Sequence, residues 1–342
     1  MNNAKSILKR KNEADKNAPS TPAEAVPEME RKSMLVGKSC NDWLKEAVNE
    51  KDPDPLWKSL WYESEICCLF ADTNLGKSIL SVQIAEEIAK SKRVALFDFE
   101  LTAKQFQIRY TNQATGKLHD FPHNLFRYQI DPEALAESQM EERFEDYILK
   151  EIESTAVQTD SKVLIIDNLT WLCNNSEKGD AAGRLMKALY RLKMLYGWSV
   201  LIIAHTPKLP LGEPITRNSL AGSKKIISFL DSAFAIGQSA SDPALRYIKQ
   251  IKVRYGAEEY GADNVLVCEI CKEDDFVHFG ERECTKESVH LWKPTDKDDR
   301  NAQIISLHED GKSLQEIANQ LHMSKSGVRK VLKTLESSNN NK

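Results

Sequence analysis

The chain has 342 residues, a formal net charge of −4 and 41% hydrophobic residues. This length allows one substantial domain plus an accessory piece, since domains usually hold roughly 100 to 200 residues. The mild acidity excludes a histone-like or membrane-coating protein, so any contact with nucleic acid must come from a local basic surface. No apolar run reaches the roughly 20 residues of a bilayer span, and the first residues lack the apolar core of a signal peptide. We therefore expect a cytoplasmic protein with no membrane partner.

In chain order, residues 1–34 are polar and hold too few apolar groups to offset the cost of ordering, so we expect a disordered tail. Residues 35–56 predict a short helix with Asn41 as its N-cap, followed by a linker broken by prolines. The main domain is expected over residues 57–290, and a small helical unit over residues 297–336.

Within the main domain, apolar strand runs alternate with helical patterns. The strand runs are EICCLF, RVALFDFE, KVLIIDNL and WSVLIIAH. Such alternation predicts an α/β fold whose mostly parallel central sheet is covered by helices on both faces. After Arg246 the alternation of strand and helix patterns ends, and the segments RYIKQIKVRYG and NVLVCEICKED follow. They predict strands that close one edge of the sheet.

The first strand run leads into a candidate phosphate-binding loop. Its residues are Ala71, Asp72, Thr73, Asn74, Leu75, Gly76, Lys77 and Ser78. The loop has P-loop spacing with only the first glycine replaced, by Ala71, and it lies between a strand and a helical run as that loop requires. Gly76 lets the backbone approach phosphate, Lys77 reaches the β and γ phosphates, and the Ser78 hydroxyl binds Mg²⁺. The alternative is a chance match in a loop.

Two carboxylates follow other strand runs. Asp167 comes directly after four apolar residues, the form expected of an acid that holds Mg²⁺ through water; the alternative is an aspartate that merely ends a strand. Glu100 lies just past the second run and precedes a helix with Thr102 as N-cap and Gln105 completing a capping box. A glutamate there is predicted to act as general base on the attacking water.

The string FDFELTAKQFQIRY resembles the strand, glutamate and helix of RecA-like hexameric ATPases, especially the replicative helicases and the plasmid-encoded RepA-type helicases. The resemblance covers residues 57–280 and implies a RecA-like P-loop NTPase that hydrolyses ATP with Mg²⁺ and forms a homo-oligomer, expected to be a hexamer. It also implies that Glu100 is catalytic and that Arg109 stacks on adenine. A solvated helix residue is the alternative for Arg109.

Two further segments resemble the same family. WSVLIIAHTPK ends its strand at His205, where the family has a glutamine or histidine that senses the γ-phosphate; a structural histidine is the alternative. QIKVRYG resembles the Lys-x-Arg segment whose basic pair reaches the neighbouring subunit's nucleotide, which implies this role for Lys252 and Arg254. Alternation along a strand predicts that these two side chains share one face.

A polar stretch between these segments opens a helix near Lys224. In ring translocases, loops at this level contact the single-stranded backbone. The side chains that suit phosphate contacts here are Arg217, Asn218, Ser219, Ser223, Lys224 and Lys225. No aromatic residue interleaves them, so base stacking is not indicated, and an ordinary flexible loop is the alternative.

The last segment predicts three helices in a helix-turn-helix pattern, with Gly311 ending the first and with Ser313 and Ser324 capping the next two. The basic side chains of the third helix, with no acid among them, are Lys325, Arg329, Lys330 and Lys333. Such a face suits DNA phosphates and base edges. The segment resembles the helix-turn-helix of resolvase-like and sigma-factor-like DNA binders; a module for protein contacts is the alternative.

The cysteines raise the question of zinc. Seven cysteines scattered over a long chain fit reduced thiols better than a disulfide framework. By their spacing along the chain alone, the candidate zinc ligands are Cys268, Cys271, His278, Cys284 and His290. However, the sequence here predicts two strands joined near residues 273–275, and residues three apart in a strand point to opposite faces. We therefore predict that Cys268 is a core residue beside Leu266 and Ile270.

Two functions from different classes remain. The first is an ATP-driven ring that translocates on or unwinds DNA in plasmid or mobile-element replication, with the C-terminal unit on duplex DNA and the ring channel on a single strand. The second is a DNA-binding regulator whose assembly is switched by ATP, without motor activity. Glu100, Lys252 and Arg254 favour turnover.

Overall fold

The computed structural model describes residues 35–137, 144–168, 180–206, 213–220, 223–291, 294–321 and 323–339. The predicted disordered tail, residues 1–34, lies outside them. The chain divides into two compact units, Met1–Asp52 and Pro53–Lys342.

The first unit contains one described helix, α2 (Cys40–Ala47). The hydroxyl oxygen of Ser39 accepts a hydrogen bond from the Asp42 backbone N–H at 3.1 Å, so Ser39 is the N-cap. The prediction of Asn41 as the cap is wrong, because the helix begins one residue before it. None of the helix residues is buried.

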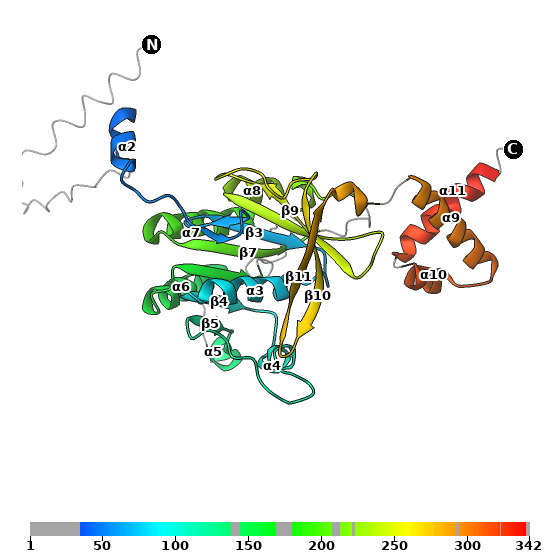
Figure 1. Ribbon diagram of the computed structural model, residues 1–342, viewed down its shortest axis with the longest axis horizontal. Helices are drawn as coiled ribbons and strands as arrows, with labels where there is room; N and C mark the ends of the chain where they lie inside the picture. The colour runs from blue at the N-terminus through cyan, green and yellow to red at the C-terminus, as the bar shows by residue number, and fades with distance from the viewer. Residues whose placement is uncertain are drawn as a thin grey trace, which may run out of the picture. The chain divides into compact units, whose positions relative to one another are not determined.

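The second unit is built on a nine-stranded sheet with the order β11-β10-β9-β8-β3-β7-β6-β4-β5 (Figure 1). Its strands are β3 (Ile66–Ala71), β4 (Val94–Asp98), β5 (Leu125–Tyr128), β6 (Val163–Asp167), β7 (Ser199–His205), β8 (Ser232–Gln238), β9 (Leu245–Lys252), β10 (Val265–Glu273) and β11 (Phe276–Thr285). From β5 to β8 all neighbours are parallel, whereas β9, β10 and β11 add antiparallel strands at one edge. The predicted α/β fold with a mostly parallel sheet and closing edge strands is confirmed.

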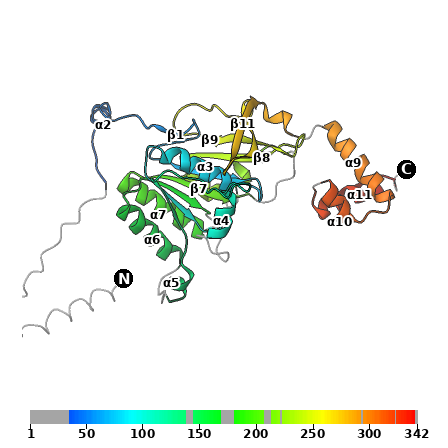
Figure 2. The same ribbon diagram turned by 60° about the horizontal axis from the view of Figure 1, so that its bottom comes forward.

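Helices cover both faces of this sheet (Figures 1 and 2). The described helices of this part of the chain are α3 (Lys77–Ala89), α4 (Ala103–Arg109), α5 (Pro132–Glu137), α6 (Phe144–Gln158), α7 (Asp180–Tyr196), η3 (Arg217–Ser219), α8 (Ser223–Phe229) and η4 (Glu287–Val289). Helices α6, α7 and α8 pack on one face, while α3 and the small hairpin of β1 (Pro55–Trp57) and β2 (Trp61–Tyr62) pack on the other. Because both faces are covered, every residue of β3 is buried, which explains its unbroken apolar run.

The hairpin of β10 and β11 continues past the sheet edge and covers α3. Phe279 exchanges two hydrogen bonds with the side chain of Gln83 in α3: its N–H donates to Oε1 at 2.8 Å and its carbonyl accepts from Nε2 at 3.3 Å. Cys268 is 1% exposed in the core of this face, as predicted, whereas Cys271 is half-buried. The hairpin therefore reaches from the sheet core to the helix that follows the phosphate loop.

The C-terminal segment folds into α9 (Pro294–Glu309), α10 (Leu314–Gln320) and α11 (Lys325–Asn339). They share a core of their own, centred on Ile304, Ile317, Ala318 and Val328. Ser313 caps α10 in a capping box with Glu316, and the Ser324 hydroxyl accepts from the Gly327 N–H at 3.1 Å at the start of α11. The three predicted helices are confirmed; DNA binding by this unit stays a prediction.

Candidate active site

The carboxyl ends of four parallel strands meet at one edge of the sheet. Their register pairs Ala71 of β3 with His205 of β7, and Asp98 of β4 with Asp167 of β6. Strand β7 lies between β3 and β6, so His205 lies between the phosphate loop and Asp167. Four segments far apart in the sequence thus bring their predicted site residues together.

The phosphate loop requires glycine at position 76 for two reasons. Gly76 has a φ of +93°, and a Cβ there would come within 2.7 Å of the Ile270 Cδ1 and 3.0 Å of the Phe279 ring. Ala71, by contrast, is the last residue of β3 and is not among the positive-φ positions, so it replaces the usual first glycine without strain. The loop is therefore compatible with its unusual sequence.

Lys77 is the first residue of α3 and is only 6% exposed. Its Nζ donates to the carbonyl oxygens of Ala71 at 3.1 Å and Asp72 at 2.9 Å. Burial lowers the pKa of Lys77, while Asp167 and Glu100 act in the opposite direction. The ammonium group is thus held along the loop whose backbone a phosphate would contact.

Ser78 and Asp167 fit a magnesium ion. Asp167 is 2% exposed, and its Oδ1 is buried without a hydrogen-bond partner among the described residues. Burial raises the pKa of Asp167 to about 7, against a hydrogen bond from Ser78, and the negative charge of Glu100 raises it further. A divalent cation, which prefers oxygen ligands, would coordinate the Oδ1 atom that lacks a partner. Its charge would also offset the repulsion between Asp167 and Glu100.

Glu100 lies just beyond β4 and contacts two side chains, one just after β6 and one at the end of β7. The Asn168 amide Nδ2 donates to Glu100 Oε1 and lies 3.1 Å from His205 Nε2, which itself lies 3.4 Å from Glu100 Oε1. The hydrogen bond from His205 is the first cause of a lowered pKa at Glu100; Lys77 adds to it, and burial opposes it. Glu100 is therefore ionised at neutral pH, as a general base must be.

Asp98 holds the backbone that carries Glu100. Its Oδ1 accepts from the N–H groups of Glu100 at 3.1 Å and Leu101 at 3.0 Å, and its Oδ2 pairs with Arg127 at 2.7 Å. Sequence reasoning missed both Asp98 and Asn168. The signal was present, since each is a polar residue at the end of an apolar strand run beside a predicted site residue.

A cavity of about 410 Å³ joins these groups. It is lined by Thr73, Asn74, Gly76, Lys77, Ser78, Ile79, Glu100, Arg109, His205 and Ile270. Arg109, the last residue of α4, has a buried NH1 atom without a hydrogen-bond partner among the described residues. The structure thus brings Arg109 to the same cavity as the phosphate loop.

Lys252 and Arg254 do not line this cavity. Strand β9 ends at Lys252 and Arg254 lies in the bend beyond it, yet the two side chains reach the adjacent residues Leu230 and Asp231. The Lys252 Nζ donates to the carbonyl oxygens of Ile227 and Leu230, and the Arg254 guanidinium pairs with Asp231 at 3.0 Å. Within its own chain, this pair therefore contacts the end of α8 and the segment between α8 and β8 rather than the cavity.

The predicted single-strand contacts lie on η3 and α8. Arg217 is exposed, and its Nε donates to the Ile251 carbonyl at 3.2 Å, while Asn218 is exposed and Ser219 is buried. The side chains of Lys224 and Lys225 lie outside the described residues.

Comparison with known proteins places the chain in a family. Residues 39–210, just over half of the chain, match the model of a family described as an AAA domain. The chain belongs to this AAA-domain family. The match spans the phosphate loop, Glu100, Asp167 and His205, so this AAA-domain protein is a P-loop ATPase by family and by site.

One similar solved structure is that of a KaiC-like protein from the hyperthermophilic archaeon Pyrococcus horikoshii, with 13% identity, a TM-score of 0.46, and coverage of 64% of this chain and 90% of that one. A TM-score this low adds nothing to the family assignment. No curated protein matches the chain. Among the described helices of this AAA-domain ATPase, none is both long and apolar enough to cross a membrane.

Proposed function

We propose that this AAA-domain protein hydrolyses ATP with Mg²⁺ as a ring of identical subunits and acts on DNA as a helicase or translocase in plasmid or mobile-element replication. One observation carries the catalytic part of the proposal. Glu100, held by Asn168 and His205, lines the same cavity as Lys77 and Ser78 of the phosphate loop. This arrangement unites phosphate binding with a general base.

Each side chain has a role that its surroundings support. Lys77 binds the β and γ phosphates, and Ser78 with Asp167 holds Mg²⁺, which when bound neutralises phosphate charge. Glu100 takes the proton of the attacking water, and His205, in contact with Glu100, senses the γ-phosphate. Arg109 stacks on adenine at the cavity wall.

The oligomeric part of the proposal rests on Lys252 and Arg254. The Arg254 side chain is 58% exposed and lies outside the cavity of its own chain. An arginine supplied by a neighbour stabilises charge on the transferring phosphoryl group, so hydrolysis would depend on assembly. We expect a hexamer.

The DNA part rests on two basic surfaces. Lys325, Arg329, Lys330 and Lys333 are all exposed on α11, which supports duplex binding by a helix-turn-helix. Arg217, Lys224 and Lys225 belong to the segment expected at the ring channel, where they would contact a single strand.

A forked-duplex unwinding assay, combined with mass measurement in ATP, tests the proposal. A motor is expected to form a closed ring in ATP, to hydrolyse ATP faster when single-stranded DNA is present, and to separate the strands. The alternative, an ATP-switched regulator, predicts ATP-dependent assembly and duplex binding with neither DNA-stimulated turnover nor strand separation. Assembly and duplex binding without stimulated turnover or strand separation would overturn the proposed motor function.

A further inference from the structure

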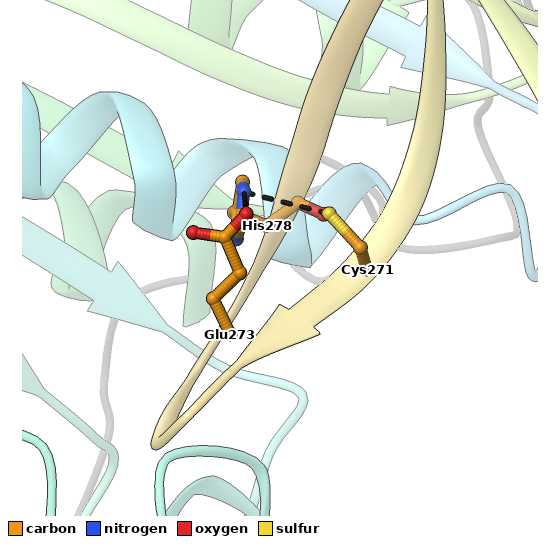
Figure 3. A group of neighbouring side chains, drawn as sticks. All are labelled: Cys271, Glu273 and His278. Carbon is orange, nitrogen blue, oxygen red and sulfur yellow. Dashed lines mark hydrogen bonds and ion pairs between the residues drawn. The ribbon is translucent and has the colours of Figure 1, made fainter.

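The hairpin of β10 and β11 gathers three potential metal ligands on one face. The strand register places Cys271 directly opposite His278, and Glu273 follows Cys271 by two residues, the spacing that returns a strand side chain to the same face. Figure 3 shows the three side chains converging beside the hairpin. The C-x-x-C spacing in the sequence pointed to another set, because Cys268 lies in the core and is not part of this cluster.

The donor atoms are close enough for one ion. The Cys271 Sγ lies 3.4 Å from the His278 Nε2, which lies 3.8 Å from the Glu273 Oε1, and all three atoms lie within 4.8 Å of one another. Bond lengths to zinc of about 2.3 Å for sulfur and about 2.0 to 2.2 Å for nitrogen and oxygen put neighbouring ligands of a tetrahedral ion roughly 3.3 to 3.6 Å apart. The arrangement needs only a small movement of Glu273.

Metal binding requires that a ligand side chain can move toward the ion and that the ion can reach the site, and the exposures of Glu273 and His278 meet both requirements. The Glu273 side chain is 79% exposed and the His278 side chain 18% exposed, so the first can rotate toward an ion while the second is held in place. Three protein ligands also leave a fourth tetrahedral position for water.

We propose that Cys271, Glu273 and His278 bind a zinc ion. A thiolate and an imidazole favour zinc over magnesium or calcium, which prefer oxygen ligands. This site is therefore chemically distinct from the oxygen-only magnesium site of Ser78 and Asp167. The proposal does not depend on the motor function.

The surroundings of His278 set the expected strength of binding. Its Nδ1 is buried without a hydrogen-bond partner among the described residues. Zinc-binding histidines usually donate their second N–H to a partner, and loss of that partner weakens metal affinity by about 10- to 100-fold. We therefore infer an exchangeable zinc site rather than a permanent structural one.

The position of the site gives zinc a route to the phosphate loop. Cys271 and His278 are each adjacent in sequence to a residue that packs near Gly76, namely Ile270 and Phe279. An ion bound to both strands would fix their spacing at the point where the hairpin covers the loop. Zinc would thus stiffen the hairpin above the nucleotide cavity.

Cobalt(II) titration of the full chain tests the proposal, because cobalt(II) replaces zinc and a thiolate ligand gives it a charge-transfer band. We expect one equivalent of cobalt to produce this band and zinc, but not excess magnesium, to abolish it. Cobalt bound by the oxygen ligands near the phosphate loop would give no thiolate band.

Variants identify the ligands. Cys271→Ser should abolish the band, and His278→Gln and Glu273→Gln should each weaken binding at least about tenfold. Cys284→Ser, which removes an exposed cysteine of β11, should leave the band unchanged. Glu273→Gln alters an exposed side chain, so its result stands even if a buried variant misfolds. No band in the wild-type chain, an undiminished band in Cys271→Ser, or unchanged affinity in Glu273→Gln would overturn the site as described.

Discussion

Asn168 contacts both Glu100 and His205 beside the phosphate loop. Its amide donates to Glu100 and lies 3.1 Å from His205 Nε2. A hydrogen bond to a charged group contributes about 1.5 to 3 kcal/mol. The amide therefore has the strength to fix the orientation of the general base.

We expect Asn168→Ala to lower kcat by about 10- to 100-fold, because a loss of that hydrogen-bond energy in the transition state corresponds to that factor. Nucleotide affinity should stay unchanged, since Asn168 is not among the cavity-lining residues. Steady-state kinetics and nucleotide titration measure both quantities. As a matched control, Asn168→Asp places a second carboxylate beside Glu100, which raises its pKa and moves the acid limb of the pH–rate profile to higher pH. A wild-type kcat in Asn168→Ala would contradict the role of Asn168 in positioning Glu100.

At the scale of residues, the sequence predicted the side chains that belong to motifs but not the side chains that position them. Lys77, Ser78 and Asp167 were predictable because spacing and strand position define them. Asn168 and Asp98 carried a signal as polar residues at strand ends, but their partners were not predictable. The contacts of Asn168 with Glu100 and His205 and of Asp98 with Arg127 depend on the register of neighbouring strands, which no local pattern specifies.

At the scale of elements, His119 joins α3 to the tip of the β10–β11 hairpin. Its ring nitrogens lie 2.9 Å from Glu86 and 2.8 Å from Asp275, which also pairs with Lys117 at 3.2 Å. Burial alone would lower the pKa of His119, but the hydrogen bonds of Asp275 and Glu86 outweigh it, so the pKa is raised. The ion pairs are therefore strongest while the ring is protonated.

We expect His119→Gln to destabilise the fold in a pH-dependent way. Because the folded pKa lies above the unfolded one, His119 contributes its full stabilisation below about pH 6.5, the unfolded value, and loses it as pH rises through the folded pKa. Urea unfolding of both proteins across a pH series measures this difference. His123→Gln, in the same segment, is the control, and an equal loss of stability at every pH would contradict the prediction.

The elements themselves were largely predictable. Apolar runs identified the strands, and capping residues such as Thr102 and Ser313 identified helix starts, because both signals are local. The end of β9 was not, since Arg254 continues the alternating pattern but lies in a bend, where it pairs with Asp231.

At the scale of the whole molecule, Arg254 tests whether subunits complete one another's sites. Mixing Arg254→Ala subunits with Glu100→Gln subunits should restore part of the turnover, because some mixed interfaces join an intact base to an intact arginine. ATP hydrolysis at several mixing ratios, with mixed rings verified by mass, measures the rescue. No rescue at any ratio would contradict a contribution from the neighbour.

The C-terminal helices should be separable from catalysis. Deleting residues 294–342 is expected to leave basal ATP hydrolysis intact, because α9, α10 and α11 have their own core and every proposed catalytic residue lies before them. The deletion should also abolish salt-sensitive duplex binding, since it removes the four basic residues of α11. Equal duplex affinity of both proteins across a salt series would instead assign this unit to protein contacts.

Ring assembly and DNA binding are the parts that neither sequence pattern nor single-chain geometry defines. A contact supplied by a neighbour, such as that expected of Arg254, leaves no intramolecular partner in the cavity it serves. The basic face of α11 was predictable from spacing on a helix, but charge alone does not distinguish DNA from an acidic protein.

The most direct test of the account is single-turnover ATP hydrolysis by the wild-type protein and Glu100→Gln, with nucleotide binding measured on the same samples. Because Glu100 acts on water rather than on phosphate, the variant should bind ATP within about twofold of the wild type and hydrolyse it at least about 100-fold more slowly. Hydrolysis by Glu100→Gln at the wild-type rate would contradict the assigned base and the catalytic site built around it.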